Sequence, residues 1–162
     1  MHVNRGGSLP RPKPVLDVRD VGPGKVLQQK GWTVTAASAR HVQPWLESLA
    51  YRVDSKKGGI VFTGDTEPCE SVSKLVKGAD ILVVNCWDHQ ETMEKNGEAL
   101  GQTGTLDSAK MAVEAGVQKL IIAHSGPHLS KPGSKEKGIA DIASTYKGEI
   151  IFGEECMDLV LW

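Results

Sequence analysis

The 162-residue sequence lacks several features that would place it in a specialised class of proteins. Its three cysteines, Cys69, Cys86 and Cys156, are odd in number and form no CxxC pair, which excludes a small disulfide scaffold and a cysteine-rich zinc knuckle. The longest apolar runs, at 81–84 and 120–123, are far too short to cross a bilayer. The first residues contain no basic segment followed by an apolar stretch, so we expect no signal peptide. We therefore expect a protein of the reducing cytoplasm that does not contact membranes.

The sequence also lacks an excess of either charge. Its 19 Lys and Arg residues oppose 20 Asp and Glu residues, so the formal net charge is -1. This balance provides no electrostatic argument for binding nucleic acid or anionic lipid. We accordingly expect a small-molecule partner rather than nucleic acid.

What the sequence does contain is typical of one globular domain preceded by a linker. Residues 1–14 have a Gly-Gly pair and three prolines, which disfavour helices and strands, so we expect a linker-like segment there. Residues 15–162 carry short apolar stretches first, and then apolar stretches that alternate with helical patterns. This order predicts a layered α/β or α+β domain.

The expected elements follow from the spacing of apolar residues and from the turn residues between them. The expected strands cover 15–21, 32–37, 49–53, 59–63, 81–84, 120–123, 150–152 and 158–162. The expected helices cover 70–77, 106–115 and 136–146, the second with Thr105 as N-cap and Gly116 just past its end. The long segment 87–105 is interpreted as a loop, and a loop of that length in a compact domain is usually functional.

Three residues with ligand side chains each follow an apolar strand. His41 comes shortly after the strand at 32–37, Asp65 after the one at 59–63, and His124 directly after the one at 120–123. Because strand ends meet at one edge of a sheet, these side chains can converge although they are far apart in sequence. Two imidazoles and a carboxylate suit zinc or a similar first-row dication, while each residue alone could equally be a capping, packing or turn residue.

Three further residues are candidates for the substrate pocket. Asp88 and His89 follow the buried strand at 81–84, and His128 lies in the glycine- and proline-containing loop after His124. They could line the pocket, orient a metal-bound histidine or transfer a proton, or they could be solvated loop residues. Cys69 and Cys86 are interpreted as small buried residues rather than nucleophiles.

Several short segments of the sequence resemble the corresponding segments of the metallo-β-lactamase-fold hydrolases. The resemblance is to the branch of the ribonuclease Z-like and arylsulfatase-like enzymes in particular. These segments are AASARH at 36–41, SLAYRV at 48–53, IVFTGDT at 60–66, GADILVV at 78–84 and AVEAGVQKLIIAH at 112–124. The resemblance covers about four fifths of the chain. It implies the C-terminal half of an αββα sandwich, with two β-sheets inside and helices outside.

The resemblance also implies roles for the three residues. His41 matches the histidine that completes the first metal site, Asp65 the carboxylate that bridges two metals, and His124 the histidine that completes the second site. The implied catalytic residue is Asp65, and the implied cofactor is a divalent metal: zinc, or alternatively manganese or iron. A pair of such ions can activate water and polarise an ester or phosphoryl oxygen.

The sequence departs from this family in two respects. The HxHxDH motif, which belongs to the first half of the fold, is absent, so each ion would have only one histidine and a shared aspartate. Catalytic zinc usually has three protein ligands, and we therefore expect the isolated chain to be weak or inactive as an enzyme. In addition, Gln102 stands where ribonuclease Z-like members carry a histidine, which argues against tRNA 3′ processing.

These observations leave three readings of the chain. It is the C-terminal portion of a binuclear metal-dependent hydrolase that cleaves a phosphodiester, sulfate ester or lactone. Alternatively, it is a half-domain that forms a homodimer to cover its apolar sheet face. The third reading is a non-catalytic binding module that keeps the scaffold without a complete metal site. We favour the first, with a missing N-terminal half or a second copy supplying the remaining ligands.

Overall fold

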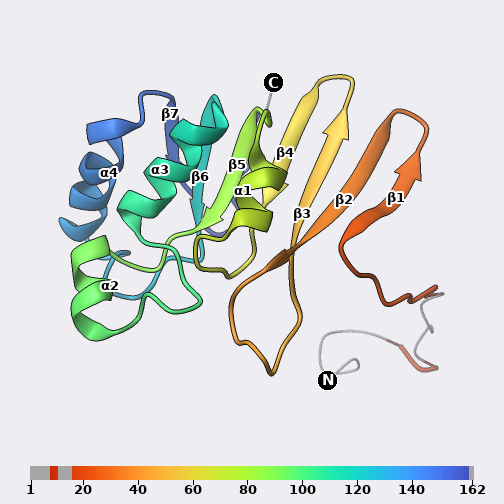
Figure 1. The fold of residues 1–162 in the computed structure, drawn as a ribbon, viewed down its shortest axis with the longest axis horizontal. Helices are drawn as coiled ribbons and strands as arrows, with labels where there is room; N and C mark the ends of the chain where they lie inside the picture. The colour runs from red at the N-terminus through yellow and green to blue at the C-terminus, as the bar shows by residue number, and fades with distance from the viewer. Residues whose placement is uncertain (1–7, 11–15, 161–162) are drawn as a thin grey trace.

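The computed structural model describes residues 8–10 and 16–160, and these form a mixed α/β fold around one sheet (Figure 1). The strands are β1 Gly24–Gln29, β2 Trp32–Ala39, β3 Ser48–Ser55, β4 Gly58–Phe62, β5 Ile81–Asn85, β6 Lys119–Ala123 and β7 Glu149–Phe152. The helices are α1 Glu70–Val76, α2 Gln90–Asn96, α3 Thr105–Ala115 and α4 Ser134–Thr145. None of the helices in the described ranges has the length and apolar content that crossing a bilayer requires.

The seven strands lie in the sheet in the same order as in the chain, from β1 to β7. Strands β1 to β4 pair antiparallel, with two-residue turns between β1 and β2 and between β3 and β4 and a longer loop, 40–47, between β2 and β3. Strands β4 to β7 pair parallel and are connected through helices. Two antiparallel steps restore the direction of a strand, so β2 and β4 point the same way, and β6 points with them. The carboxyl ends of these three strands therefore lie at one edge of the sheet.

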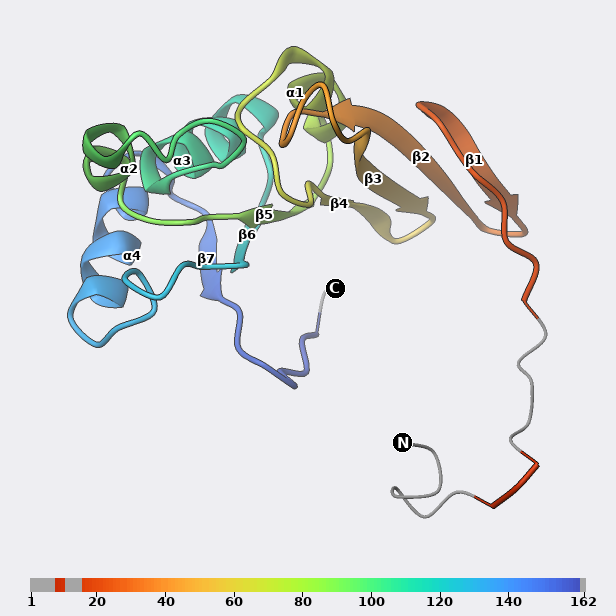
Figure 2. The same cartoon turned by 90° about the horizontal axis from the view of Figure 1, so that it is seen from below.

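The main hydrophobic core lies between the helices and one face of the sheet. Val61, Leu82 and Leu120 belong to it, together with Val72 from α1 and Ala112 from α3. Figure 2 shows α1, α2 and α3 over this face. The adjacent strand residues point to the opposite face, because side chains alternate along a strand.

A second, smaller cluster occupies that opposite face. Its buried members are Ile60, Ile81 and Ile121, and partly buried valine and isoleucine side chains surround them. The segment after β7 runs below this face in Figure 2. The described residues thus build one sheet with helices against one side, and they do not themselves form a second sheet of a sandwich.

Most of the expected elements are confirmed. The hairpin of β3 and β4, the buried strands β5 and β6, and the helices α1, α3 and α4 lie within two residues of their expected bounds. Gly116 ends α3 with a φ of 72°, a left-handed conformation that glycine adopts without strain. Gly104, rather than Thr105, occupies the N-cap of that helix.

Two expected strands are wrong. Residues 16–21 are exposed and form no strand, because their period-two alternation has no neighbouring strand to bury it. Residues 158–160 also form no strand, and the rest of that stretch lies outside the described residues. The linker expected at 1–14 lies outside them too, apart from 8–10, which are exposed.

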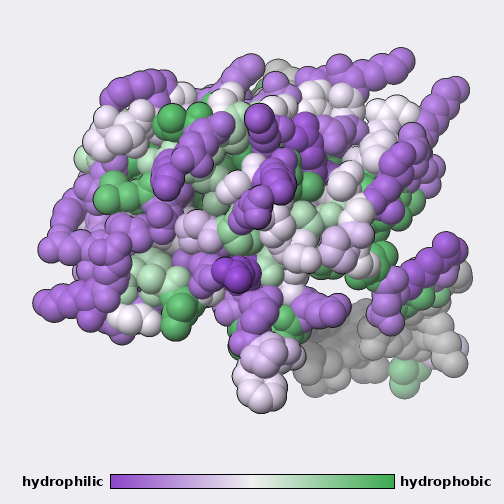
Figure 3. Space-filling model, in the orientation of Figure 1, coloured by the Kyte–Doolittle hydropathy of each residue, from purple (hydrophilic) through white to green (hydrophobic). Residues whose placement is uncertain are grey.

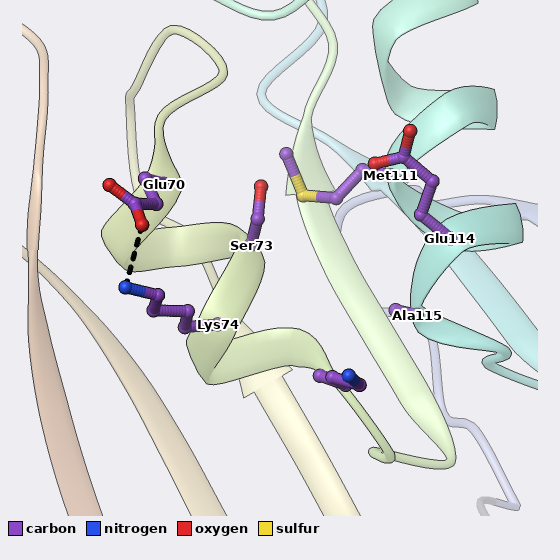
Figure 4. A pocket seen from close by; sticks show the side chains of 7 residues that line it. Glu70, Ser73, Lys74, Met111, Glu114 and Ala115 are labelled. Atoms are coloured by element: carbon purple, nitrogen blue, oxygen red, sulfur yellow. Dashed lines mark ion pairs between the residues drawn. The ribbon is translucent and has the colours of Figure 1, made fainter.

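The face of the molecule that bears the helices is mainly hydrophilic (Figure 3). Hydrophobic residues appear on it in separate small areas and not as one continuous patch. A groove between α1 and α3 is lined by charged and small side chains, among them Glu70, Lys74 and Glu114 (Figure 4). Glu70 and Lys74 form an exposed i,i+4 ion pair there, and none of the candidate site residues lines this groove.

Candidate metal centre

His41, Asp65 and His124 all follow carboxyl ends of strands at the same edge of the sheet. His41 follows β2, Asp65 follows β4 and His124 follows β6. Strands in a sheet are about 4.8 Å apart, so the outer two of these strands are separated by roughly 20 Å. Asp65 comes from the middle strand, and it is the residue that both histidines can reach.

The two oxygens of Asp65 face different histidines. Oδ1 lies 2.5 Å from Nδ1 of His124, and Oδ2 lies 3.8 Å from Nε2 of His41. The side chains are partly exposed, by 31% for Asp65, 25% for His41 and 54% for His124, so ions and substrates can reach them. A carboxylate placed between two imidazoles in this way can serve two cations at once.

The ring of His41 is held in the tautomer that a metal requires. Its Nδ1 lies 2.8 Å from the carbonyl oxygen of Gly101, which can only accept a hydrogen bond, so Nδ1 carries the proton. The lone pair of Nε2 then points toward Asp65. Hydrogen bonds of this kind fix the orientation of metal-bound histidines in many proteins.

Gly101 is tightly packed against the loop that carries His41. A Cβ at this position would lie 2.2 Å from the carbonyl oxygen of His41, and the φ of Gly101 is +75°. Glu67 also contributes, because its carboxylate accepts a hydrogen bond from the Gly101 amide at 3.0 Å. The close approach of the two loops therefore depends on glycine at position 101.

The distances between donor atoms match those around a divalent metal ion for one of the two histidines and not for the other. Two bonds of about 2.1 Å at a tetrahedral angle place donor atoms about 3.4 Å apart. The His41–Asp65 separation of 3.8 Å is close to this value, whereas the His124–Asp65 contact of 2.5 Å is a direct hydrogen bond. An ion between the latter pair needs the imidazole to retreat by about 1 Å and to lose its Nδ1 proton.

A second group of candidate residues lies closer together than the first. Ligand atoms of Asp88, His89 and His128 all lie within 4.8 Å of one another, and no other three His, Cys, Asp or Glu residues in the described part of the chain lie this close together. His41, Asp65 and His124 are therefore more spread out, as expected if two ions share Asp65 and a single ion is not held by all three.

The second group is mostly buried. Asp88 and His89 are only 5% and 4% exposed, whereas the side chain of His128 is 56% exposed. The Nδ1 of His128 donates to the carboxylate of Asp88, at 2.9 and 3.0 Å from its two oxygens. His128 is thus the member that a substrate can reach, and the pocket role of all three residues stays a prediction.

The sequence does not indicate the two hydrogen-bond partners of the His89 ring. Its Nδ1 lies 3.0 Å from Oδ2 of Asp141, and its Nε2 lies 3.0 Å from Oγ of Ser134. Both partners belong to α4, which lies 45 or more residues along the chain. His89 is the N-cap residue of α2, in a segment that we expected to be a loop. The burial of its side chain could therefore not be predicted from the sequence either.

Gln102 lies beside the metal centre but has no acid–base function. Its side-chain oxygen Oε1 accepts a hydrogen bond from the Nδ2 of Asn85 at 2.7 Å. Cys86 lies nearby in the core, where burial raises the pKa of its thiol to about 12. A neutral amide and a protonated thiol can shape this edge of the sheet but cannot transfer a proton at neutral pH.

Comparison with known families identifies the domain. Residues 2–125 match the family model described as a beta-lactamase superfamily domain. Ribonuclease BN of Escherichia coli is 35% identical over 124 residues, which cover 73% of this chain and 38% of that protein. Ribonuclease Z of Mycobacterium tuberculosis is 26% identical over 147 residues, which cover 88% of this chain and 53% of that protein.

Solved structures show the same fold. The metallo-beta-lactamase fold protein YhfI from Bacillus subtilis superimposes with a TM-score of 0.68 at 21% identity, over 83% of this chain and 52% of that one. The short form of human tRNase Z has a TM-score of 0.62 at 18% identity, over 85% of this chain and 46% of that one. These likenesses confirm the expected fold class.

The expectation that nucleic acid is not a partner is wrong. It was based on the balanced net charge and on Gln102, but the curated relatives are ribonucleases. Net charge averages the whole surface and does not report local binding groups, and a site that acts on phosphodiesters through metal ions needs no large basic excess. The expectation of a small-molecule partner in place of nucleic acid fails for the same reason.

The chain spans about half the length of the curated relatives that it matches. Within that span it has the sheet, the helices and the strand-end ligands in one consistent arrangement. The matching family model covers most of the sequence, and the fold implies divalent metal. The chain therefore belongs to the beta-lactamase superfamily and has the metallo-β-lactamase fold.

Proposed function

We propose that this chain carries the C-terminal ligands of a binuclear metal centre that hydrolyses phosphodiester bonds in RNA. The observation that carries the proposal is the position of Asp65, whose two oxygens face His41 and His124. The ribonuclease relatives favour a phosphodiester over a sulfate ester or lactone. We further propose that zinc is the metal, because imidazole and carboxylate ligands suit it and a structural neighbour, PqqB from Methylobacterium extorquens, is a Zn(2+)-bound protein.

Each side chain has a distinct task in this proposal. Bound dications supply Lewis acidity and lower the pKa of a water molecule. Asp65 offers one carboxylate oxygen toward each histidine, and the Gly101 carbonyl places the proton of neutral His41 on Nδ1, which leaves Nε2 as the nitrogen that can bind metal. His124 packs beside Trp87, with ring centroids 6.0 Å apart, which limits the rotation of its imidazole.

An exposed aromatic residue supports the choice of RNA. Trp45 lies four residues after His41 and is 84% exposed. Its loop is held in shape by Gln43, whose side chain accepts from the His41 amide at 2.8 Å and donates to the Ala39 carbonyl at 2.9 Å. Exposed aromatic rings stack on unpaired bases, at about 1–3 kcal/mol per base. Trp45 is thus suited to hold a nucleotide close to the metal centre.

The protein ligands for each ion are too few for strong metal binding. Each ion has one histidine and a shared carboxylate from this chain, whereas catalytic zinc usually has three protein ligands. We propose that polypeptide outside this chain supplies the others, as the HxHxDH motif does in the resembling family. A non-catalytic or dimerising half-domain is the alternative that this incomplete set favours.

The test is RNA cleavage by the purified chain with Zn²⁺ or Mn²⁺, using Asp65→Asn as the matched control. Asparagine keeps the shape of the side chain but removes the charge that both ions need. We expect slow cleavage of a single-stranded oligonucleotide that the substitution abolishes. Preference for a lactone or sulfate ester, or cleavage that persists in Asp65→Asn, would contradict the proposal.

Two further outcomes decide the finer points. Trp45→Ala should raise the KM for the oligonucleotide and leave the KM for a small chromogenic phosphodiester unchanged. A chain that binds no metal and cleaves no substrate, even when a polypeptide with the HxHxDH motif is added, would establish the non-catalytic alternative. The cytoplasmic setting stays a prediction, which imaging of the tagged protein in intact cells would test.

A further inference from the structure

We propose that Asp88, His89 and His128 form a separate cation site that holds the loop after β6 in a fixed position. The site is distinct from the centre at Asp65 and does not depend on the function proposed above. Its ligand atoms come from one carboxylate and two imidazoles, within 4.8 Å of one another. This is the same donor set that holds zinc in many proteins with three protein ligands.

Asp141 orients His89 for this role. The carboxylate of Asp141 can only accept, so Nδ1 of His89 carries the proton in their 3.0 Å hydrogen bond. The lone pair of Nε2 then accepts a hydrogen bond from the hydroxyl of Ser134 at 3.0 Å, and a bound cation would displace that hydroxyl. A carboxylate that holds one nitrogen of a histidine while the other binds metal is a recurrent arrangement in metal sites.

Asp88 is the acidic member of the site, and hydrogen bonds compensate for its burial. It is almost fully buried, and its oxygens accept from the His89 amide at 2.8 Å and from Nδ1 of His128. Burying a carboxylate is costly unless a cation or several hydrogen bonds compensate for it. In the proposed site the cation takes the place of the proton that His128 shares with Asp88.

The site has a route to solvent and an effect on neighbouring elements. His128 is half-exposed, so an ion can enter past it and the site need not form during folding. The three ligands come from the start of α2 and from the loop after β6, and the orienting Asp141 comes from α4. A cation here joins these elements, and the loop that it fixes begins at His124.

The test counts zinc ions by equilibrium dialysis and elemental analysis. The variant His41→Ala/His124→Ala removes the centre at Asp65, and we expect it to retain one equivalent of Zn²⁺. Adding His128→Gln should remove that equivalent. Adding Lys131→Gln, an exposed position in the same loop without a ligand atom, should not.

Three further measurements test the proposal independently of the double variant. If the double histidine variant fails to fold, His128→Gln in the otherwise unchanged chain should still lower the stoichiometry by one. Asp141→Asn should weaken the affinity of this site by about 10- to 100-fold. Zinc should also shift the ring ¹⁵N resonance of His89 Nε2. Zinc binding that survives the addition of His128→Gln to the double histidine variant, an unchanged stoichiometry when His128→Gln is made alone, or a double variant that folds and binds none, would overturn the proposal.

Discussion

The contact between Gly101 and His41 allows the link between backbone packing and metal affinity to be tested. Gly101 has a φ of +75°, and a Cβ there would lie 2.2 Å from the carbonyl oxygen of His41. Gly101→Ala therefore adds the strain of a left-handed alanine, about 1 kcal/mol, and an overpacking term of about 1–3 kcal/mol. The expected loss in the free energy of unfolding is about 2–4 kcal/mol in total.

A matched control separates the two contributions. Gly97 ends α2 with a similar φ of 70°, but a Cβ there would meet no atom within 4 Å. Gly97→Ala should therefore lose only about 1 kcal/mol. Urea denaturation of both variants, monitored by circular dichroism, measures the difference.

The functional consequence should appear in Gly101→Ala alone. Displacement of the Gly101 carbonyl releases Nδ1 of His41, and loss of such an orienting bond typically weakens metal affinity by about 10- to 100-fold. Titration of Co²⁺ into folded samples of both variants measures this change. Equal destabilisation by the two substitutions, together with unchanged cobalt affinity, would refute the role assigned to Gly101.

Two other predictions concern the reactivity of the cysteines and the contribution of Arg52 to stability. Cys156 is exposed, whereas burial raises the pKa of Cys86 to about 12, so iodoacetamide at pH 8 should alkylate Cys156 and spare Cys86 until the protein unfolds; mass spectrometry of the peptides checks this. Arg52 donates to the carbonyls of Leu75 and Lys77 at the end of α1, both at 2.9 Å, so Arg52→Met should lower the free energy of unfolding by about 2 kcal/mol. The exposed Arg19–Asp17 pair provides the comparison, because Arg19→Met should change it by less than about 0.5 kcal/mol.

A further prediction concerns pH. Burial raises the pKa of the Tyr146 hydroxyl to about 12 in the folded protein, with a smaller contribution from Glu149. An acid whose pKa is raised by folding stabilises the fold below its unfolded pKa, and that contribution is lost as pH rises toward the folded pKa. Stability should thus decline between about pH 10 and 12, and Tyr146→Phe should flatten the decline. An unchanged slope in urea denaturation across this range would contradict this reasoning.

The sequence predicts the interior of this fold better than its edges. β5 and β6 are buried on both faces, so their apolar runs are visible without any knowledge of their neighbours. β1 was missed because GKVLQQ lies at the edge of the sheet, where almost every residue is exposed. α2 was missed for a related reason, since Met93 is its only buried residue. Elements that bury little apolar surface leave little pattern in a sequence.

The candidate site could be predicted in composition but not in geometry. The positions of His41, Asp65 and His124 after strands implied that they share an edge, because strand direction follows from the order of hairpins and helices. The partners that hold the rings could not be predicted. The Gly101 carbonyl and the Asp141 carboxylate act from segments 60 and 52 residues away, and such contacts depend on the packing of the completed fold.

The agreement between strand order and chain order has a consequence for how this domain can diversify. Each ligand loop leaves the same rim of the sheet, while the tight hairpin turns of β1–β2 and β3–β4 close the opposite rim. Extra residues inserted at the ligand rim enlarge or reshape the substrate opening without changing any strand pairing. Relatives with the same scaffold can therefore differ in specificity through the loops at the ligand rim alone.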